Sequence, residues 1–211
     1  MIWVYLAVGL ILTRVPFLGK YFRIFNTLIH EIGHFLMSIF VGAKVYKVSL
    51  NADTSGEAIT ESRGRFRNIL IAFAGYPFAS GIALMSVWVL EQGYYEYFLY
   101  GLTSVAIVSM ILWVRNKFGI AWLSLVVAIS ILLAKYGTVK MVEVYVWTIV
   151  GVMLMESVSS TVQLVILAKR NKYEAGDATN LSRFTYIHPM VWALVFMAMA
   201  CYVLLLAVKI V

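Results

Sequence analysis

Two histidines and a glutamate lie close together at His30, Glu31 and His34. His30 and His34 are four residues apart, so on a helix they share one face and lie about 6 Å apart along the axis. Two imidazoles on one face can bind a single metal ion. Glu31 follows the first of them and can act as general base toward a metal-bound water. The spacing therefore predicts a zinc site with a hydrolytic base beside it.

Short motifs arise by chance, so the surroundings of this one decide how much it indicates. The chain has three histidines, and two of them lie here. Glu31 lies in an apolar run, where an ionisable side chain is costly and is a functional candidate by default. Gly33 keeps the same helix thin and leaves room for another backbone to approach. The alternative is that His30 and Glu31 only form hydrogen bonds between helices.

The chain as a whole is too apolar for a soluble fold. Its 211 residues are 63% hydrophobic and 13% charged, whereas soluble domains are about 45–50% apolar and about 25% charged. Apolar runs that we interpret as helical spans lie near residues 1–13, 24–43, 69–90, 98–114, 118–134, 142–168 and 189–208. The first of them is short and is expected to be tilted or only partly inserted. We predict an all-α polytopic membrane protein with about six to seven transmembrane helices, in which residues 1–211 form a single membrane-embedded domain.

Two polar stretches interrupt the apolar runs. In residues 44–68, the segment Val45–Leu50 alternates apolar and polar side chains as a half-exposed strand does. Turn residues follow, and Glu57–Thr60 can return as a second strand. We therefore predict a small β-hairpin at the membrane surface over residues 44–60, directly after the motif helix. The second polar stretch is residues 169–188.

Basic residues in the loops give the chain its net charge of +7. Short clusters of Lys and Arg between apolar runs contact anionic headgroups, which predicts the lipid bilayer as partner and no nucleic acid. The loops at 44–68, 115–117 and 169–188 hold five, two and four such residues, and the other loops hold six in all. The positive-inside rule puts these three loops in the cytoplasm. It predicts a multi-pass protein of the cell membrane with its active site toward the cytoplasmic side.

Several segments together resemble a known family. The segments Asn26–His34, Gly42–Val45 and Val48–Asn51 resemble the site-2 protease type of intramembrane zinc metallopeptidase (peptidase family M-50). Four more are similar to the smaller B-like branch of that family: Asp53–Gly56, Ala74–Pro77, Arg115–Gly119 and Gly176–Leu181. The resemblance covers most of the chain. It implies a helical membrane bundle, one Zn²⁺ bound by His30 and His34, and hydrolysis of peptide bonds within or beside the bilayer.

The family also implies a third zinc ligand, usually an Asp in an Asp-Gly motif on a later helix. This chain departs from the pattern, because it contains no Leu-Asp-Gly or Asn-Pro-Asp-Gly segment. Asp177, ahead of a predicted amphipathic helix, is the first candidate, and its alternative role is to cap that helix. Glu156, deep in an apolar run, is the second, with a buried hydrogen bond as its alternative. Asp53 is the third, with turn formation as its alternative.

These observations predict an intramembrane zinc metalloendopeptidase that acts on membrane-anchored proteins or membrane-associated peptides. Glu31 is the predicted catalytic base, and the hairpin is predicted to pair with an extended substrate by strand addition. One alternative is a non-catalytic zinc-binding scaffold or regulator of the membrane. A metal or ion transporter is the other, but Glu156 and Gln163 are the main polar candidates outside the motif helix, which is few for a pathway.

Small and helix-breaking residues interrupt the third predicted span at Gly75, Tyr76, Pro77 and Gly81. One interpretation is a kink that opens a path for the substrate. The other is close packing between helices, which small residues permit in membranes. Sequence favours the second interpretation without naming the packing partner.

Overall fold

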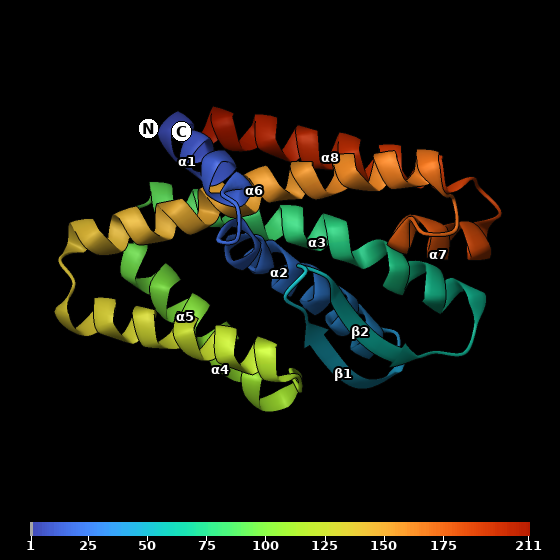
Figure 1. Ribbon diagram of the computed structural model, residues 1–211, viewed down its shortest axis with the longest axis horizontal. Helices are drawn as coiled ribbons and strands as arrows, with labels where there is room; N and C mark the ends of the chain where they lie inside the picture. Colours follow the sequence, from blue (N-terminus) through green and yellow to red (C-terminus); the bar gives the residue numbers. More distant parts are fainter. Residues whose placement is uncertain (1) are drawn as a thin grey trace.

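The computed structural model describes residues 2–211, so Met1, the first residue of the predicted span 1–13, lies outside the described part. The elements in chain order are α1 (Ile2–Arg14), α2 (Gly19–Phe40), β1 (Lys44–Leu50), β2 (Gly56–Glu61), α3 (Arg65–Glu91), α4 (Tyr95–Leu112), α5 (Lys117–Tyr136), α6 (Val139–Arg170), α7 (Gly176–Thr185) and α8 (Pro189–Ile210). Helices α3, α6 and α8 run along the long axis of the molecule and pack on one another (Figure 1). The predicted fold class, a helical membrane protein with a small hairpin after the motif helix, is confirmed.

Five of the described helices, α3, α4, α5, α6 and α8, are each long and apolar enough to cross a bilayer. Helices α1 and α2 meet these requirements of length and composition only together, as a pair bent by 110°. The helix breaks because Pro16 has no backbone N–H and Phe17 adopts a left-handed conformation with φ of 62°. The chain is an integral membrane protein, and the segments 1–13 and 24–43 are two arms of one bent pair rather than the two separate spans that the sequence predicts.

Two facing glycines let α1 lie directly against α6. A Cβ atom added to Gly9 would lie 2.5 Å from the carbonyl carbon of Gly151, and one added to Gly151 would lie 2.8 Å from the carbonyl carbon of Tyr5. One turn earlier, the rings of Tyr5 and Trp147 stack with centroids 5.6 Å apart. Close backbone approach at small residues is a common way for membrane helices to associate. This close approach fixes α1 on α6, while α2 packs on α3, on α6 and on the hairpin.

We expect Gly151→Ala to lower the free energy of unfolding by about 1–3 kcal/mol, because the added methyl meets backbone that cannot rotate away. Thermal unfolding of the purified protein in detergent measures the loss. Gly101→Ala in α4 is the matched control, since nothing lies within 4 Å of its added Cβ. The control should be neutral or stabilising by up to about 1 kcal/mol, the gain in helix propensity. Equal stability of the two variants would exclude the close packing of α1 on α6.

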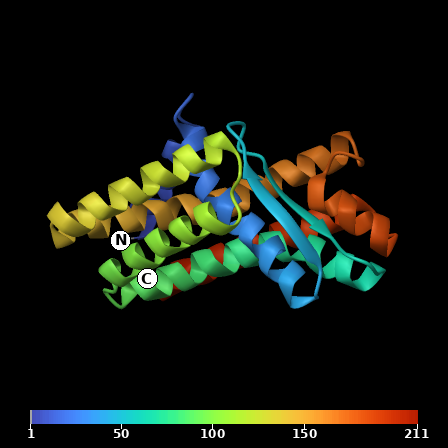
Figure 2. The same ribbon diagram turned by 90° about the horizontal axis from the view of Figure 1, so that it is seen from below.

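The hairpin lies over α2, as Figure 2 shows from below. Its strands are antiparallel, with Leu50 opposite Gly56 and Lys44 opposite Glu61. At the turn, the Thr27 hydroxyl of α2 donates a hydrogen bond of 3.0 Å to the carbonyl of Thr54. The strands and the turn therefore cover the motif helix from the side that the sequence predicts to be cytoplasmic.

The loop between α4 and α5 holds the outer edge of β1. The Val48 N–H donates to the Trp113 carbonyl at 3.0 Å, and the Leu50 N–H donates to Oδ1 of Asn116 at 3.1 Å. The amide group of Asn116 donates back to the Leu50 carbonyl. These bonds give Arg115–Gly119 a structural role that the resemblance alone did not reveal, because they occupy one edge of the hairpin. In the described residues, β2 pairs with no strand besides β1.

Candidate metal centre

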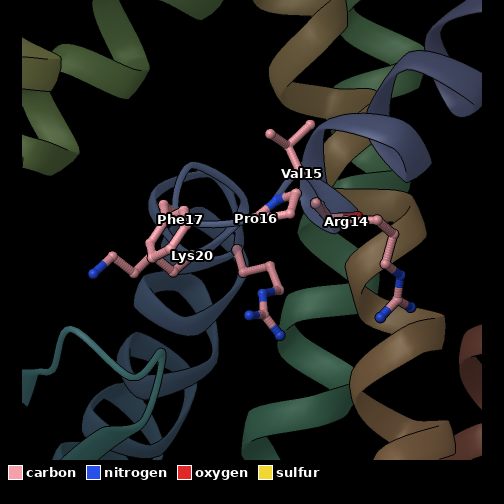
Figure 3. Close-up of a pocket in the computed structure, with 7 residues that line it drawn as sticks. Arg14, Val15, Pro16, Phe17 and Lys20 are labelled. Atoms are coloured by element: carbon pink, nitrogen blue, oxygen red, sulfur yellow. The ribbon is translucent and has the colours of Figure 1, made fainter.

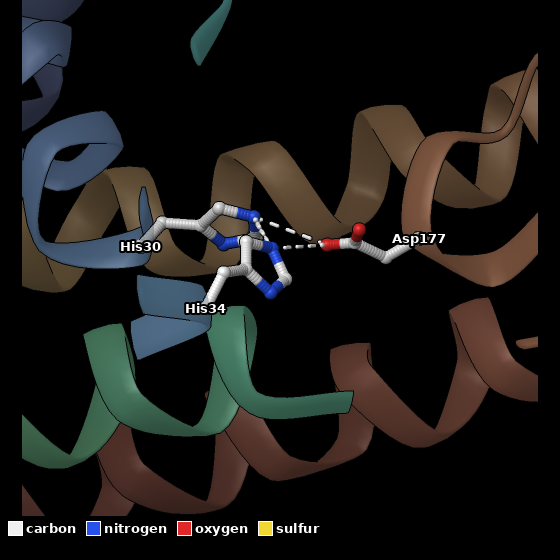
Figure 4. A group of neighbouring side chains, drawn as sticks. All are labelled: His30, His34 and Asp177. Atoms are coloured by element: carbon white, nitrogen blue, oxygen red, sulfur yellow. Dashed lines mark hydrogen bonds and ion pairs between the residues drawn. The ribbon is translucent and has the colours of Figure 1, made fainter. Parts of the chain in front are cut away.

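Three side chains from two distant elements meet at one point beneath the hairpin. His30 and His34 project from one face of α2, and Asp177 projects toward them from α7 (Figure 4). The Nε2 atoms of the two histidines are 3.0 Å apart. Oδ2 of Asp177 lies 3.1 Å from each of them. In the described residues this is the group of His, Cys, Asp and Glu side chains close enough together to share a metal ion.

A backbone carbonyl orients the second histidine. Nδ1 of His34 lies 2.7 Å from the carbonyl oxygen of Ile71 on α3, and it must carry the proton of that hydrogen bond because a carbonyl can only accept. In the neutral imidazole the lone pair then belongs to Nε2, which faces His30 and Asp177. Metal-binding histidines commonly make this kind of hydrogen bond with the nitrogen that does not bind the metal.

Asp177 reaches the histidines because of the backbone before it. Gly176 has a positive φ of 42°, which a glycine adopts without strain, and this turns the chain into α7. Ala175, not Asp177, is the N-cap, and no side chain caps the helix there. Asp177 lies in the first turn of α7 and directs its carboxylate at the imidazoles. It therefore does not serve as the helix cap.

The three atoms suit a small cation. In tetrahedral zinc sites with bonds near 2.0–2.1 Å, neighbouring ligand atoms lie about 3.3 Å apart, close to the 3.0–3.1 Å observed here. A carboxylate oxygen and two imidazole nitrogens therefore converge on one point, as the ligands of a small cation do.

Glu31 lies between the metal-binding face and the hairpin. It is buried, with 5% of its surface exposed. Gly56 of β2 packs against it so closely that an added Cβ would lie 2.6 Å from its Cγ, and the backbone of Ala58 faces its carboxylate. The second strand of the hairpin thus runs past the residue that the motif assigns as base.

Gly75 and Tyr76 border the centre, although the sequence suggested only a kink or helix packing for them. A Cβ added to Gly75 would lie 2.6 Å from Nε2 of both His30 and His34. The ring of Tyr76 lies with its centroid 4.5 Å from that of His30, nearly perpendicular to it. The packing interpretation is therefore the better one, and the partner is the imidazole pair. In the sequence, the only feature that pointed to a functional role of Gly75 and Tyr76 was their place in the Ala74–Pro77 segment, which resembles the family.

The other two candidates for the third ligand lie elsewhere. Asp53 accepts hydrogen bonds from the backbone and hydroxyl of Ser55, at 3.0 and 2.6 Å, within the hairpin turn. Glu156 is buried in α6, where the charged groups that act on it are Arg23 and Arg14. Neither belongs to the group formed by His30, His34 and Asp177 in the described residues.

Comparison with known proteins identifies a family. The model of the family described as Peptidase M50B-like matches residues 2–207, nearly the whole chain. No curated protein and no solved structure matches it. The resemblance stated from the motif segments is therefore confirmed, and the matched range contains both the His-Glu-x-x-His motif and Asp177.

Proposed function

Because the chain belongs to the Peptidase M50B-like family, we propose that it is an intramembrane zinc metalloendopeptidase that cleaves membrane-anchored protein substrates. The observation that carries the proposal is the convergence of His30, His34 and Asp177 on one point, with Glu31 beside it. Membership in a family of peptidases sets the general activity. The zinc, the ligand set and the catalytic base are what we add to it.

The residues divide the chemistry between them. His30, His34 and Asp177 would hold the zinc, which supplies a Lewis acid for activating water and for stabilising negative charge on the scissile carbonyl. Glu31 accepts a proton from the attacking water and later returns it to the leaving amine. Burial of Glu31 under β2 keeps bulk water away from this proton transfer. The Ile71 carbonyl keeps the His34 ring in one orientation throughout.

The free edge of β2 offers a way to present the substrate. A peptide bond inside a helix is shielded by its hydrogen bonds, so a substrate helix must become extended before cleavage. Strand β1 is occupied on both edges, by β2 and by the loop that contains Trp113. Strand β2 pairs with β1 alone in the described residues, and it runs past Glu31. An extended segment added to that edge lies beside the catalytic base, which supports a role for the hairpin in substrate binding.

The proposal is tested by reconstituting the purified chain in liposomes with a fraction of single-span membrane proteins. Mass spectrometry then identifies new peptide termini. We expect termini within or beside hydrophobic spans, and we expect them to disappear when a zinc chelator is added before reconstitution. New termini that persist in the chelator, or that lie only in soluble domains, would contradict the proposal.

Gly75→Ala should weaken zinc binding at least tenfold, because its methyl group would press on both imidazole nitrogens and displace them from the metal, as changes to supporting groups do. The dissociation constant is measured by competition with a chromophoric chelator. Gly81→Ala in the same helix is the matched control, since its added Cβ has open space around it. Unchanged zinc affinity in Gly75→Ala would show that the metal, if bound, lies elsewhere.

A further inference from the structure

A second polar site lies at the bend between α1 and α2. A cavity of about 410 Å³ opens there, lined by residues 13–17 together with Lys20 and Arg23. Figure 3 shows Arg14 reaching toward α6 on one side of the bend and Lys20 extending on the other. Three positively charged side chains, Arg14, Lys20 and Arg23, therefore border one cavity.

These cations have few polar partners among the described residues, and Lys20 lies over the ring of Tyr21, 5.1 Å from its centroid. Arg14 donates one hydrogen bond, from Nη2 to the hydroxyl of Ser159 at 2.7 Å. Nε of Arg23 is buried and has no acceptor. Among the described residues, none of the ion pairs within 4 Å involves Arg14, Lys20 or Arg23. Buried donors normally find an acceptor, so Nε of Arg23 is available to an acceptor that enters the cavity.

One acidic residue lies near them and does not neutralise the group. Glu156 of α6 is buried, its Oε2 has no hydrogen-bond partner, and Arg23 and Arg14 are the charged groups that act on it. One carboxylate cannot balance the charge of three cations, so the cavity keeps a net positive charge. Guanidinium groups match the oxygen atoms of a phosphate in planar, two-pronged contacts, and lysine adds a point charge.

The bend lies beside the first turns of α5. Just after it, the carbonyl of Tyr21 accepts a hydrogen bond of 3.0 Å from the Trp122 indole, and the Tyr21 ring lies 6.1 Å from that of Phe118. Phe118 and Trp122 belong to the first turns of α5, where a membrane span begins. At the bend itself, Phe17 and Leu18 expose 88% and 58% of their surfaces. Exposed apolar side chains next to cations suit a phospholipid, with its acyl chains beside Phe17 and its phosphate in the cavity.

We propose that the cavity at the α1–α2 bend binds a phosphate group, held by Arg14 and Arg23 with Lys20 supplying further positive charge. The site is distinct from the metal centre but lies on the same helix, since Arg23 precedes His30 by seven residues, which is two helical turns, or about 10 Å. Binding there stabilises the bend and so holds the motif helix in place. An anionic phospholipid or free inorganic phosphate would each satisfy the site.

Two ligand titrations test the proposal on the full chain in a zwitterionic detergent. The first uses water-soluble short-chain phosphatidylglycerol and the second uses inorganic phosphate. The apparent dissociation constant comes from the rise of the thermal unfolding midpoint with ligand concentration. The double variant Arg14→Gln/Arg23→Gln should weaken binding at least tenfold, since each charge-assisted contact contributes about that factor or more. The charge-matched control is Arg63→Gln/Arg67→Gln, two exposed arginines, and it should bind as the wild type does.

The outcomes separate the two ligand sources. A response to phosphatidylglycerol that the double variant loses supports the site with a lipid as its ligand, and such a response to inorganic phosphate supports it with the free ion. If the double variant does not fold, Lys20→Gln, which removes a half-exposed side chain, should weaken the same response several-fold. The absence of any response in the wild type, or equal responses in the wild type, the bend variant and the control, would overturn the proposal.

Discussion

Glu31→Gln will stop peptide cleavage and leave zinc bound. Glutamine keeps the size of the side chain and its packing under Gly56 but cannot take up a proton at neutral pH. General base catalysis contributes about 10²–10⁴-fold, so we expect turnover of a reconstituted substrate to fall by at least about that factor. Initial cleavage rates and zinc content are measured on the same preparation.

Glu174→Gln is the matched control, because it makes the same chemical change at an exposed position shortly before α7. It should retain both zinc and activity. If the chain were a non-catalytic scaffold, the wild type, Glu31→Gln and Glu174→Gln would all bind zinc and none of them would cleave the substrate. Full cleavage by Glu31→Gln would exclude the proposed role of this residue as base.

Asp177→Ala will weaken zinc binding at least about 100-fold, because loss of a direct ligand costs more than the 10–100-fold that loss of a supporting group costs. The two remaining candidates provide the comparison. Glu156→Ala and Asp53→Ala should keep the wild-type affinity, since neither side chain lies with the histidines. Zinc dissociation constants for the three variants decide among the three carboxylates.

A fold measurement accompanies these affinities. Thermal unfolding of the metal-free proteins should show that Asp177→Ala still folds, because α7 is held by the buried side chains of Ala178, Thr179 and Leu181. Zinc that survives in Asp177→Ala but is lost in Glu156→Ala would overturn the ligand assignment.

The local parts of the site could be predicted from the sequence. His30 and His34 lie on one face because a helix repeats every 3.6 residues, and the alternation in Val45–Leu50 reports a strand because a strand repeats every two. The spans of α3 to α6 and α8 follow from apolar length alone. Each of these inferences needs only neighbours within one element.

The contacts between distant elements could not be predicted in the same way. Asp177 meets His34 across 143 residues of chain, and only the packing of α7 against α3 and α8 brings it there. From the sequence alone, three carboxylates therefore remained candidates for the third zinc ligand. Gly75 was recognised as a packing residue, but its contact with the imidazoles depends on which face of α3 meets α2.

The bend between α1 and α2 was also missed. A short apolar segment precedes Pro16 and a longer one follows it, and hydropathy interprets them as two spans, the first of them short. The direction in which the chain continues after Pro16 depends on Phe17 taking a left-handed conformation and on Gly9 meeting Gly151. No periodicity in the sequence reports either feature.

A zinc titration under cleavage conditions tests the central claim most directly. The metal-stripped wild-type chain is reconstituted with a membrane-anchored substrate, and zinc is added stepwise while new peptide termini are measured. We expect no cleavage without zinc and a linear rise that stops at one zinc per chain, because His30, His34 and Asp177 form one site. Full cleavage by the metal-stripped protein, or no cleavage by a chain that holds one zinc, would contradict the claim.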